Sequence, residues 1–176
     1  KQFRYAVTPL EPGEHELPPE ALALPWRADA DCVVGEFARW QGARVPGRLV
    51  ASAKSWLCHD GVDRTGAILP WGGASDVPKL SPVEASARVL RYLIDAWNVA
   101  HPEAPAGEQD VVITVPASFD EAARSLTVRA ARTAGLEHFT LLEEPQAAFY
   151  DYTARQRGGP SRGFGDARLA LVVDVG

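Results

Sequence analysis

The sequence predicts an α/β protein with a parallel-type sheet flanked by helices, and the segment between residues 110 and 152 carries this prediction. Val111 to Val115 is a β-branched apolar run closed by a proline, which is typical of a buried strand. A helical repeat follows over residues 118–135, and Phe139 to Leu142 is a second strand candidate. Because strands that alternate with helices pair in parallel, we expect functional residues near their carboxyl ends.

The helix between these two strands has signals at both ends. Ser118 and Glu121 have the spacing of a capping box, and Gly135 supplies a C-terminal stop. Apolar residues recur between these ends at helical spacing: Ala123, Leu126, Ala130 and Ala134. After the second strand, Pro145 is suited to open another helix, and residues 146–152 are compatible with it.

The first 45 residues carry the weakest pattern. Phe3 to Thr8 alternates enough to predict a strand, and Asp31 to Gly35 is a second, short strand candidate. Residues 11–25, between them, hold four prolines and four glutamates, which favours a surface connection or an extended edge. Residues 37–41 are compatible with a short helix.

From Pro46 the pattern sharpens, because this proline suits a first helical position. The apolar residues after it share one helical face: Leu49, Ala53, Trp56 and Leu57. Residues 60–66 and 72–78 predict turns, and residues 66–71 between them predict a strand.

A longer helix is predicted next, with a second capping box at its start. Ser81 is the cap, Pro82 takes the first helical position and Glu84 the third. An apolar stripe continues for about five turns and closes near His101 and Pro102. A stripe of this kind indicates core packing, and we assign it no chemistry.

The length, the net charge and the composition of the chain argue against several classes of protein. A chain of 176 residues can bury one sizeable core. Its 18 basic and 23 acidic residues give a net charge of −5, which favours neither a nucleic-acid partner nor a membrane surface. No apolar run approaches the roughly 20 residues of a membrane span, and no signal peptide opens the chain. With no methionine and an end in mid-motif, we expect a piece of a longer protein.

The cysteines and histidines do not predict a metal site. Cys58, His59 and His101 are the candidates, but no second pair stands at ligand spacing, and the other two histidines, His15 and His138, are isolated. Cys32 and Cys58 are also too few for a disulfide framework, so a reducing, cytoplasmic location is expected.

Unusual residues occupy the two strand ends, VPASF at 115–119 and EEPQAAF at 143–149. Here the chain resembles the DnaK-like heat shock protein 70 chaperone family, whose ATPase domain shares its fold with actin and the sugar kinases. In that family a VPA-x-F strand end, an AGL turn and an EP-x-AA helix start occur in this order and at this spacing. The resemblance extends to LALVVDVG at 169–176 and covers about residues 46–176.

The resemblance implies part of an actin/ribonuclease H-like ATPase fold, from lobe I of the nucleotide-binding domain. Residues 1–20 and 87–176 would form a partial core subdomain, and residues 21–86 a smaller α/β outer subdomain. The full-length parent would bind and hydrolyse ATP with Mg²⁺ to control its binding of unfolded peptides. Clients and co-chaperones would bind regions outside this chain, and no nucleic acid or membrane is expected.

Two residues are implied in catalysis. A lysine equivalent to Lys54 reaches the terminal phosphate in the family, whereas taken by itself Lys54 would be a solvated helix lysine. Glu144 matches the family's EP glutamate, which orients water or a metal-bound water. Its alternative role is a helix N-terminal carboxylate that complements the helix dipole.

Two further sites are implied in nucleotide binding and in relay. Asp174 and Gly176 match the start of the family's second glycine-rich phosphate loop. In the family the aspartate of this loop lies by the magnesium and holds it through water. The alternative for this pair is a plain Asp-Gly turn. Pro116 and Arg124 match the proline and arginine that relay nucleotide state to the peptide-binding half. Otherwise Pro116 would end a strand and Arg124 would be a solvated helix residue.

Two residues differ from the family pattern and leave other classes of protein possible. Glu143 stands where the better-known chaperones have asparagine, and Gln146 where they have threonine. A non-catalytic regulatory or scaffolding protein on the actin-like fold, and a sugar-kinase-like phosphotransferase, are the alternatives. The first phosphate loop of the family and most of the second are absent from the chain. We therefore expect the parent to be an ATPase and this stretch alone to be inactive, with no ATP bound to it.

Overall fold

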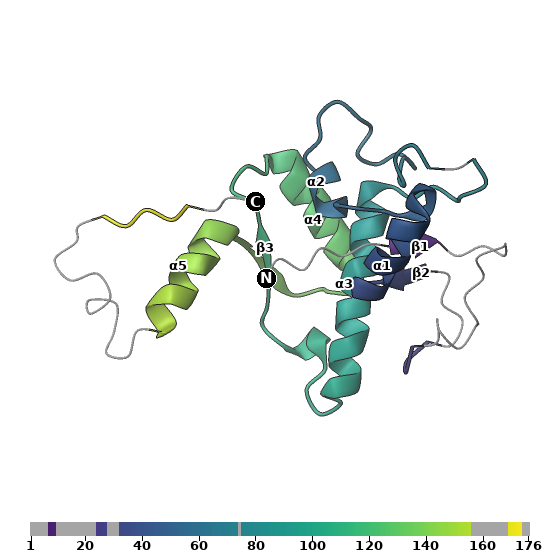
Figure 1. The fold of residues 1–176 in the computed structure, drawn as a ribbon. Helices are drawn as coiled ribbons and strands as arrows, with labels where there is room; N and C mark the ends of the chain where they lie inside the picture. The colour runs from purple at the N-terminus through teal and green to yellow at the C-terminus, as the bar shows by residue number, and fades with distance from the viewer. Residues whose placement is uncertain (1–6, 10–23, 28–31, 74, 156–168, 174–176) are drawn as a thin grey trace. The chain divides into compact units, whose positions relative to one another are not determined.

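The computed structural model describes residues 7–9, 24–27, 32–73, 75–155 and 169–173, and the chain divides into two compact units (Figure 1). One unit comprises residues 1–109 and 121–137 and holds most of the helices. The other comprises residues 110–120 and 138–176 and holds a parallel strand pair. We call them the helical unit and the strand unit.

Two short strands open the helical unit. β1 (Val7–Pro9) pairs antiparallel with β2 (Cys32–Val34), with Val7 opposite Val34. The predicted strand at residues 3–8 therefore overlaps β1 in part, and residues 1–6 lie outside the described residues. The strand predicted around residue 33 and the short helix after it are confirmed by β2 and by α1 (Glu36–Arg44).

The continuous helix predicted from Pro46 is wrong. The structure has a 3-10 turn, η2 (Pro46–Arg48), and a separate short helix, α2 (Ala53–Trp56). Tertiary packing separates them, because Val50 is buried in the core and Ser52 adopts a left-handed backbone conformation. The strand predicted at residues 66–71 is reduced to a single bridge between Leu69 and Leu80.

The long helix predicted after Ser81 is confirmed as α3 (Pro82–Ala100). The Ser81 hydroxyl oxygen accepts a hydrogen bond from the Glu84 backbone N–H at 3.0 Å, as a capping residue should. Pro82 occupies the first turn, where no backbone N–H is needed. The apolar stripe is buried at its N-terminal half, and Trp97 near its end is partly exposed.

α4 (Glu121–Thr133) packs along α3, and Figure 1 shows the two helices side by side. Small buried side chains permit this contact: Ala123, Ala130, Ala131 and Ala134. α4 begins at Glu121, three residues after the predicted cap Ser118. The predicted stop is confirmed, because Gly135 has φ +95° and its N–H donates to the Arg132 carbonyl at 2.9 Å.

The strand unit contains the predicted parallel pair. β3 (Val111–Val115) and β4 (Phe139–Glu143) run in register, from Val111 opposite Phe139 to Val115 opposite Glu143. α5 (Glu144–Arg155) begins directly after β4, with Pro145 in its first turn. Parallel strands need a crossover connection, and α4 lies in the segment that joins β3 to β4.

The apolar run Leu169 to Val173 is not in a strand. These residues carry no strand pairing, and Leu169 is 92% exposed. A strand obtains its backbone hydrogen bonds from a neighbouring strand, so an apolar sequence alone does not form one. The Asp174 and Gly176 positions that follow lie outside the described residues.

Candidate functional site

The register of the strand unit brings two predicted site residues together. Because Val115 is paired with Glu143, Pro116 and Glu144 follow at the adjacent carboxyl ends of β3 and β4. Ligands of α/β folds bind outside such strand ends. This edge is therefore the part of the described chain best placed to carry chemistry.

The turn after β3 is held at both of its ends. Val115 is fully buried, and the N–H of the buried Phe119 donates to the Pro116 carbonyl at 3.1 Å. Pro116 is itself half-buried, and Ala117 and Ser118 between the anchors are exposed. A turn fixed in this way presents its backbone at a defined position beside the end of β4.

Glu144 is the first residue of α5 and is half-buried. A carboxylate in the first helical turn interacts favourably with the helix dipole, so this position suits a negative charge. Carboxylate oxygens are also ligands for hydrated Mg²⁺ and acceptors for a reacting water. The geometry is compatible both with a catalytic carboxylate and with one that only complements the helix.

Lys54 lies in the helical unit, on the exposed side of α2. The helix is anchored on the opposite side by the buried Ala53 and Leu57. Ser52, two residues before the lysine, has φ 55° and ψ 37°. A non-glycine residue in this region persists only where its surroundings determine the backbone, as is often the case near functional sites.

Aromatic stacking fixes the C-terminal end of α2. The Trp56 ring stacks on Trp71 with centroids 5.1 Å apart and on His59 with centroids 5.3 Å apart. Sequence reasoning missed this three-ring stack, because Trp71 lies on a different loop and no local spacing connects it with Trp56. The stack limits the orientations that α2, and with it Lys54, can adopt.

The turn predicted at residues 60–66 is confirmed, and the structure adds the hydrogen bonds that hold it. The Thr65 hydroxyl donates to Asp63 Oδ1 at 2.8 Å, and the Thr65 backbone N–H donates to the same oxygen at 2.9 Å. These hydrogen bonds hold the pKa of Asp63 below its ordinary value. The Asp-Arg-Thr-Gly order is the available signal for it, since aspartate caps such turns through this bond.

The predicted site residues are divided between the two units. Lys54 and Arg124 belong to the helical unit, where Arg124 is half-buried in α4. Pro116 and Glu144 belong to the strand unit and lie at the same edge of its sheet.

Nowhere in the described ranges do three or more His, Cys, Asp or Glu side chains gather in a group that could hold a metal ion. Asp174, the predicted magnesium neighbour, is outside those ranges. Among the helices of the described part of the chain, none combines the length and the apolar composition needed to cross a membrane.

Comparison with known proteins identifies the family. The model of the family described as "Hsp70 protein" matches residues 29–176. The "Chaperone protein HscA homolog" of Azotobacter vinelandii is 39% identical over 153 residues, which cover 80% of this chain and 24% of that protein. The "Heat shock 70 kDa protein BIP3" of Oryza sativa subsp. japonica is 34% identical over 164 residues, which cover 82% and 23%.

The chain thus spans about a quarter of the length of these curated relatives. The family match confirms the predicted family and, with it, the actin-like ATPase fold class, of which the parallel pair and its helices form a part. The chain belongs to the Hsp70 family.

Proposed function

We propose that the protein carrying this chain is a molecular chaperone that binds and hydrolyses ATP to control its hold on unfolded peptides. The chain would supply part of lobe I of the nucleotide-binding domain. Family membership supports this proposal, as do the chaperone names of the relatives. The observation that carries it is the register of β3 and β4, which brings Pro116 and Glu144 to one sheet edge.

In this proposal two side chains act on the reacting phosphate. Lys54 neutralises negative charge on the terminal phosphate, a role that suits an exposed ammonium on an anchored helix. Glu144 orients the attacking water or a water of the metal, from the first turn of α5. Mg²⁺, held through water by Asp174 with Glu144 orienting one of its waters, would supply positive charge for the phosphates.

Nucleotide binding would add two residues at the C-terminal end of the chain. Asp174 would hold Mg²⁺ through water, and the backbone N–H of Gly176 would contribute to a phosphate loop. Both roles suit the residue types, because carboxylate oxygens are preferred magnesium ligands and glycine allows close approach of the backbone.

We further propose how the chain divides into subdomains, which residues relay nucleotide state, and where the protein acts in the cell. Residues 1–20 and 87–176 would belong to a core subdomain and residues 21–86 to a smaller outer one. Pro116 and Arg124 would relay nucleotide state to the peptide-binding half. Clients and co-chaperones would bind elsewhere in the full-length protein, in the cytoplasm.

Single-turnover ATP hydrolysis by the full-length protein tests the catalytic roles. We expect Lys54→Ala and Glu144→Ala each to slow hydrolysis by about two orders of magnitude, the typical loss for one positioned electrostatic group. Nucleotide affinity should fall much less, because most of the binding contacts lie outside these two side chains. Arg129→Gln and Glu137→Gln serve as controls, since both residues are exposed and neither is implied in the site.

The outcome separates catalytic from non-catalytic roles. Wild-type turnover in both the Lys54 and the Glu144 variant would refute the catalytic assignment. A wild-type protein that binds ATP without hydrolysing it would instead favour a regulatory or scaffolding protein on the same fold.

A further inference from the structure

α2, the helix that carries Lys54, is too short to hold its own orientation. It consists of four residues, which is about one helical turn. A helix of this length is not stable by itself, so tertiary packing must fix it. Ser52, directly before the helix, makes no side-chain cap hydrogen bond. The position of the Lys54 side chain therefore depends on what the rest of α2 contacts.

The inner side of α2 rests on a core cluster of the helical unit. Ala53 belongs to this cluster, and the partly buried Trp56 packs against it. The other buried members come from β2, from α3 and from the segments around α2: Cys32, Val50, Leu69, Leu80 and Ala85. Because Ala53 offers only a methyl group, Trp56 is the larger of the two apolar side chains by which α2 is held.

Trp71 contacts Trp56 from a different segment of the chain. The two rings are stacked, with centroids 5.1 Å apart and an angle of 29° between their planes. Trp71 is 61% exposed, so it adds little apolar burial to the core. Its placement is therefore explained better by its contact with α2 than by the hydrophobic effect.

Trp71 lies in a β-turn at residues 70–73, which we call the 70–73 turn. The Gly73 N–H donates to the Pro70 carbonyl at 3.1 Å, and the Lys79 ammonium donates to the same oxygen at 2.6 Å. Gly72 has φ +64°, a conformation that favours glycine at the third position of such a turn. Since Pro70 is also fully buried, the turn holds the Trp71 backbone at a defined place.

The 70–73 turn lies directly against η2, the segment that leads into α2. A Cβ atom added to Gly73 would lie 2.6 Å from the Gly47 carbonyl oxygen, so the two backbones approach closely. Beyond the turn, Asp76 Oδ2 lies 2.5 Å from Arg48 Nη2. The segment that carries Trp71 is thus joined to η2 at two points.

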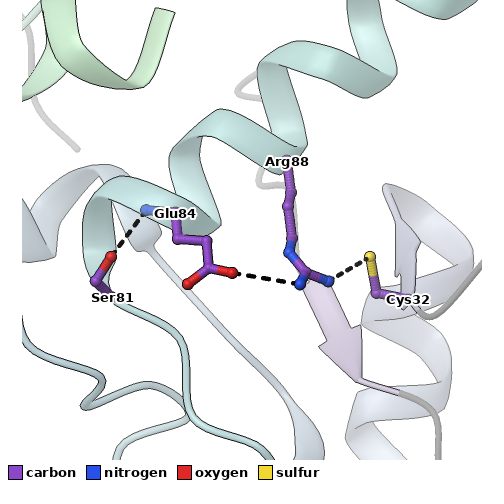
Figure 2. A network of polar contacts seen from close by, with 4 residues as sticks. All are labelled: Cys32, Ser81, Glu84 and Arg88. Carbon is purple, nitrogen blue, oxygen red and sulfur yellow. Dashed lines mark hydrogen bonds and ion pairs between the residues drawn. The ribbon is translucent and has the colours of Figure 1, made fainter. Parts of the chain in front are cut away.

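The same segment is anchored to α3 at its far end. Leu80, which is buried and hydrogen-bonded to the backbone of Leu69, directly precedes the α3 cap Ser81. Figure 2 shows how the first turns of α3 are held: Glu84 N–H donates to Ser81 at 3.0 Å, and Arg88 lies 3.4 Å from Glu84 Oε1 and 3.5 Å from Cys32 Sγ. The frame around Trp71 is therefore rigid.

We propose that Trp71 is a positioning residue for Lys54. Its ring, held by the 70–73 turn, fixes Trp56 and with it the orientation of α2, so Trp71 acts through the helix and not by contact with the phosphate. This inference rests on the proposed role of Lys54 in ATP hydrolysis. Without the ring Lys54 is still present but less precisely placed, and a misplacement of about 1 Å can slow a reaction by about a hundredfold.

Single-turnover ATP hydrolysis by the full-length protein tests the proposal. We expect Trp71→Ala to slow hydrolysis by about tenfold, less than the loss of Lys54 itself, and to leave ATP affinity nearly unchanged. Trp71→Phe keeps a ring that can stack and should stay within about twofold of wild type. Trp40→Ala is the matched control, because Trp40 is 55% exposed on α1 and its ring is paired with Arg44, outside the three-ring stack.

Two further variants separate positioning from a general structural defect. If Trp71 acts through Lys54, the double variant Trp71→Ala with Lys54→Ala should hydrolyse ATP as slowly as Lys54→Ala alone, since coupled residues are not additive. Lys79→Met removes one hydrogen bond of the 70–73 turn and leaves both rings intact. It should slow hydrolysis in the same direction as Trp71→Ala, by a smaller factor.

Cys58 reports the order of α2 without any nucleotide. It follows the helix directly, is half-buried, and its sulfur donates to the Ser55 carbonyl at 3.2 Å. Alkylation of the folded protein by iodoacetamide, followed by peptide mass spectrometry, gives the rates at Cys58 and at the buried Cys32 in one sample. Trp71→Ala should raise the ratio of the Cys58 rate to the Cys32 rate, and Trp71→Phe should not.

Three results would overturn the inference while leaving the role of Lys54 intact. They are wild-type hydrolysis by Trp71→Ala, equal slowing by Trp71→Ala with and without Lys54, and an unchanged Cys58 ratio in Trp71→Ala. Wild-type hydrolysis by Lys54→Ala would instead refute the proposed function, and the inference with it, so the two failures are distinguishable.

Discussion

Replacing Gly135 by alanine should destabilise the helical unit through the backbone alone. Gly135 has φ +95°, a conformation that costs a residue with a Cβ atom about 1–2 kcal/mol. Its N–H donates to the Arg132 carbonyl at 2.9 Å, and the next N–H, of the buried Leu136, donates to the Ala131 carbonyl at 3.0 Å. A rotation of φ toward negative values would break both bonds, so the strain cannot be relieved without loss of the cap.

The contact made by the new methyl group adds little to this cost. An added Cβ would lie 3.1 Å from Arg91 Nη1, which is the end of a flexible side chain and can move away. We therefore expect the free energy of unfolding to fall by about 1–2 kcal/mol, mainly from the backbone. For a chain of this size the midpoint of thermal unfolding should fall by about 2–4 °C for each kcal/mol.

Urea and thermal unfolding of three variants test the argument. Gly135→Asn should be less destabilised than Gly135→Ala, because asparagine tolerates the left-handed region better. Gly107→Ala is the control, since an added Cβ there meets nothing within 4 Å and the backbone needs no positive φ. It should be neutral or stabilising by about 0.4–1 kcal/mol. A Gly135→Ala protein as stable as wild type would refute the reasoning.

Three other predictions follow from local geometry and from the proposed relay. Gly42→Ala should lower the free energy of unfolding by about 1–3 kcal/mol in urea titrations, because the new Cβ would lie 2.7 Å from Leu49 Cγ within the core. The Asp63 carboxyl should titrate below its ordinary pKa of 3.8 in NMR experiments, and Thr65→Val should raise that pKa toward it. Since the folded pKa is depressed, the stability from this turn is present above pH 3.8 and lost as the pH falls through the folded pKa. In the full-length protein, Pro116→Gly and Arg124→Ala should weaken the stimulation of peptide release by ATP while ATP binding stays nearly intact; unchanged stimulation in both would exclude them from the relay.

Elements with local signals could be predicted from the sequence. The start of α3 depends on Ser81 and Pro82, which act within one turn of the helix, and the structure contains the expected cap bond. The end of α4 at Gly135 could be predicted in the same way, because few residues other than glycine adopt a positive φ at a helix end. The β3 and β4 pair followed from two apolar runs separated by one helix.

Elements that depend on contacts between distant parts of the chain could not be predicted from local sequence. The apolar spacing after Pro46 is that of a helix, yet Leu49 packs against the buried Val33 and Ala38 and ends the regular pattern. The run from Leu169 to Val173 has a strand's composition but lacks a paired neighbour among the described residues. The stack of Trp56 on Trp71 likewise joins segments that no local spacing connects.

The position of Glu144 shows how the candidate site depends on packing away from the chemistry. On β3, Val112 is 53% exposed and Val115 is fully buried, so alternate residues face opposite sides of the sheet. A slip of the pairing by one residue would turn every side chain of β4 to the other face. The buried face therefore fixes Glu143 opposite Val115, and Glu144 then begins α5 beside Pro116. If Glu144 has the proposed catalytic role, a core substitution that weakens this register should move the carboxylate without altering it, and hydrolysis should slow because of its position and not its charge.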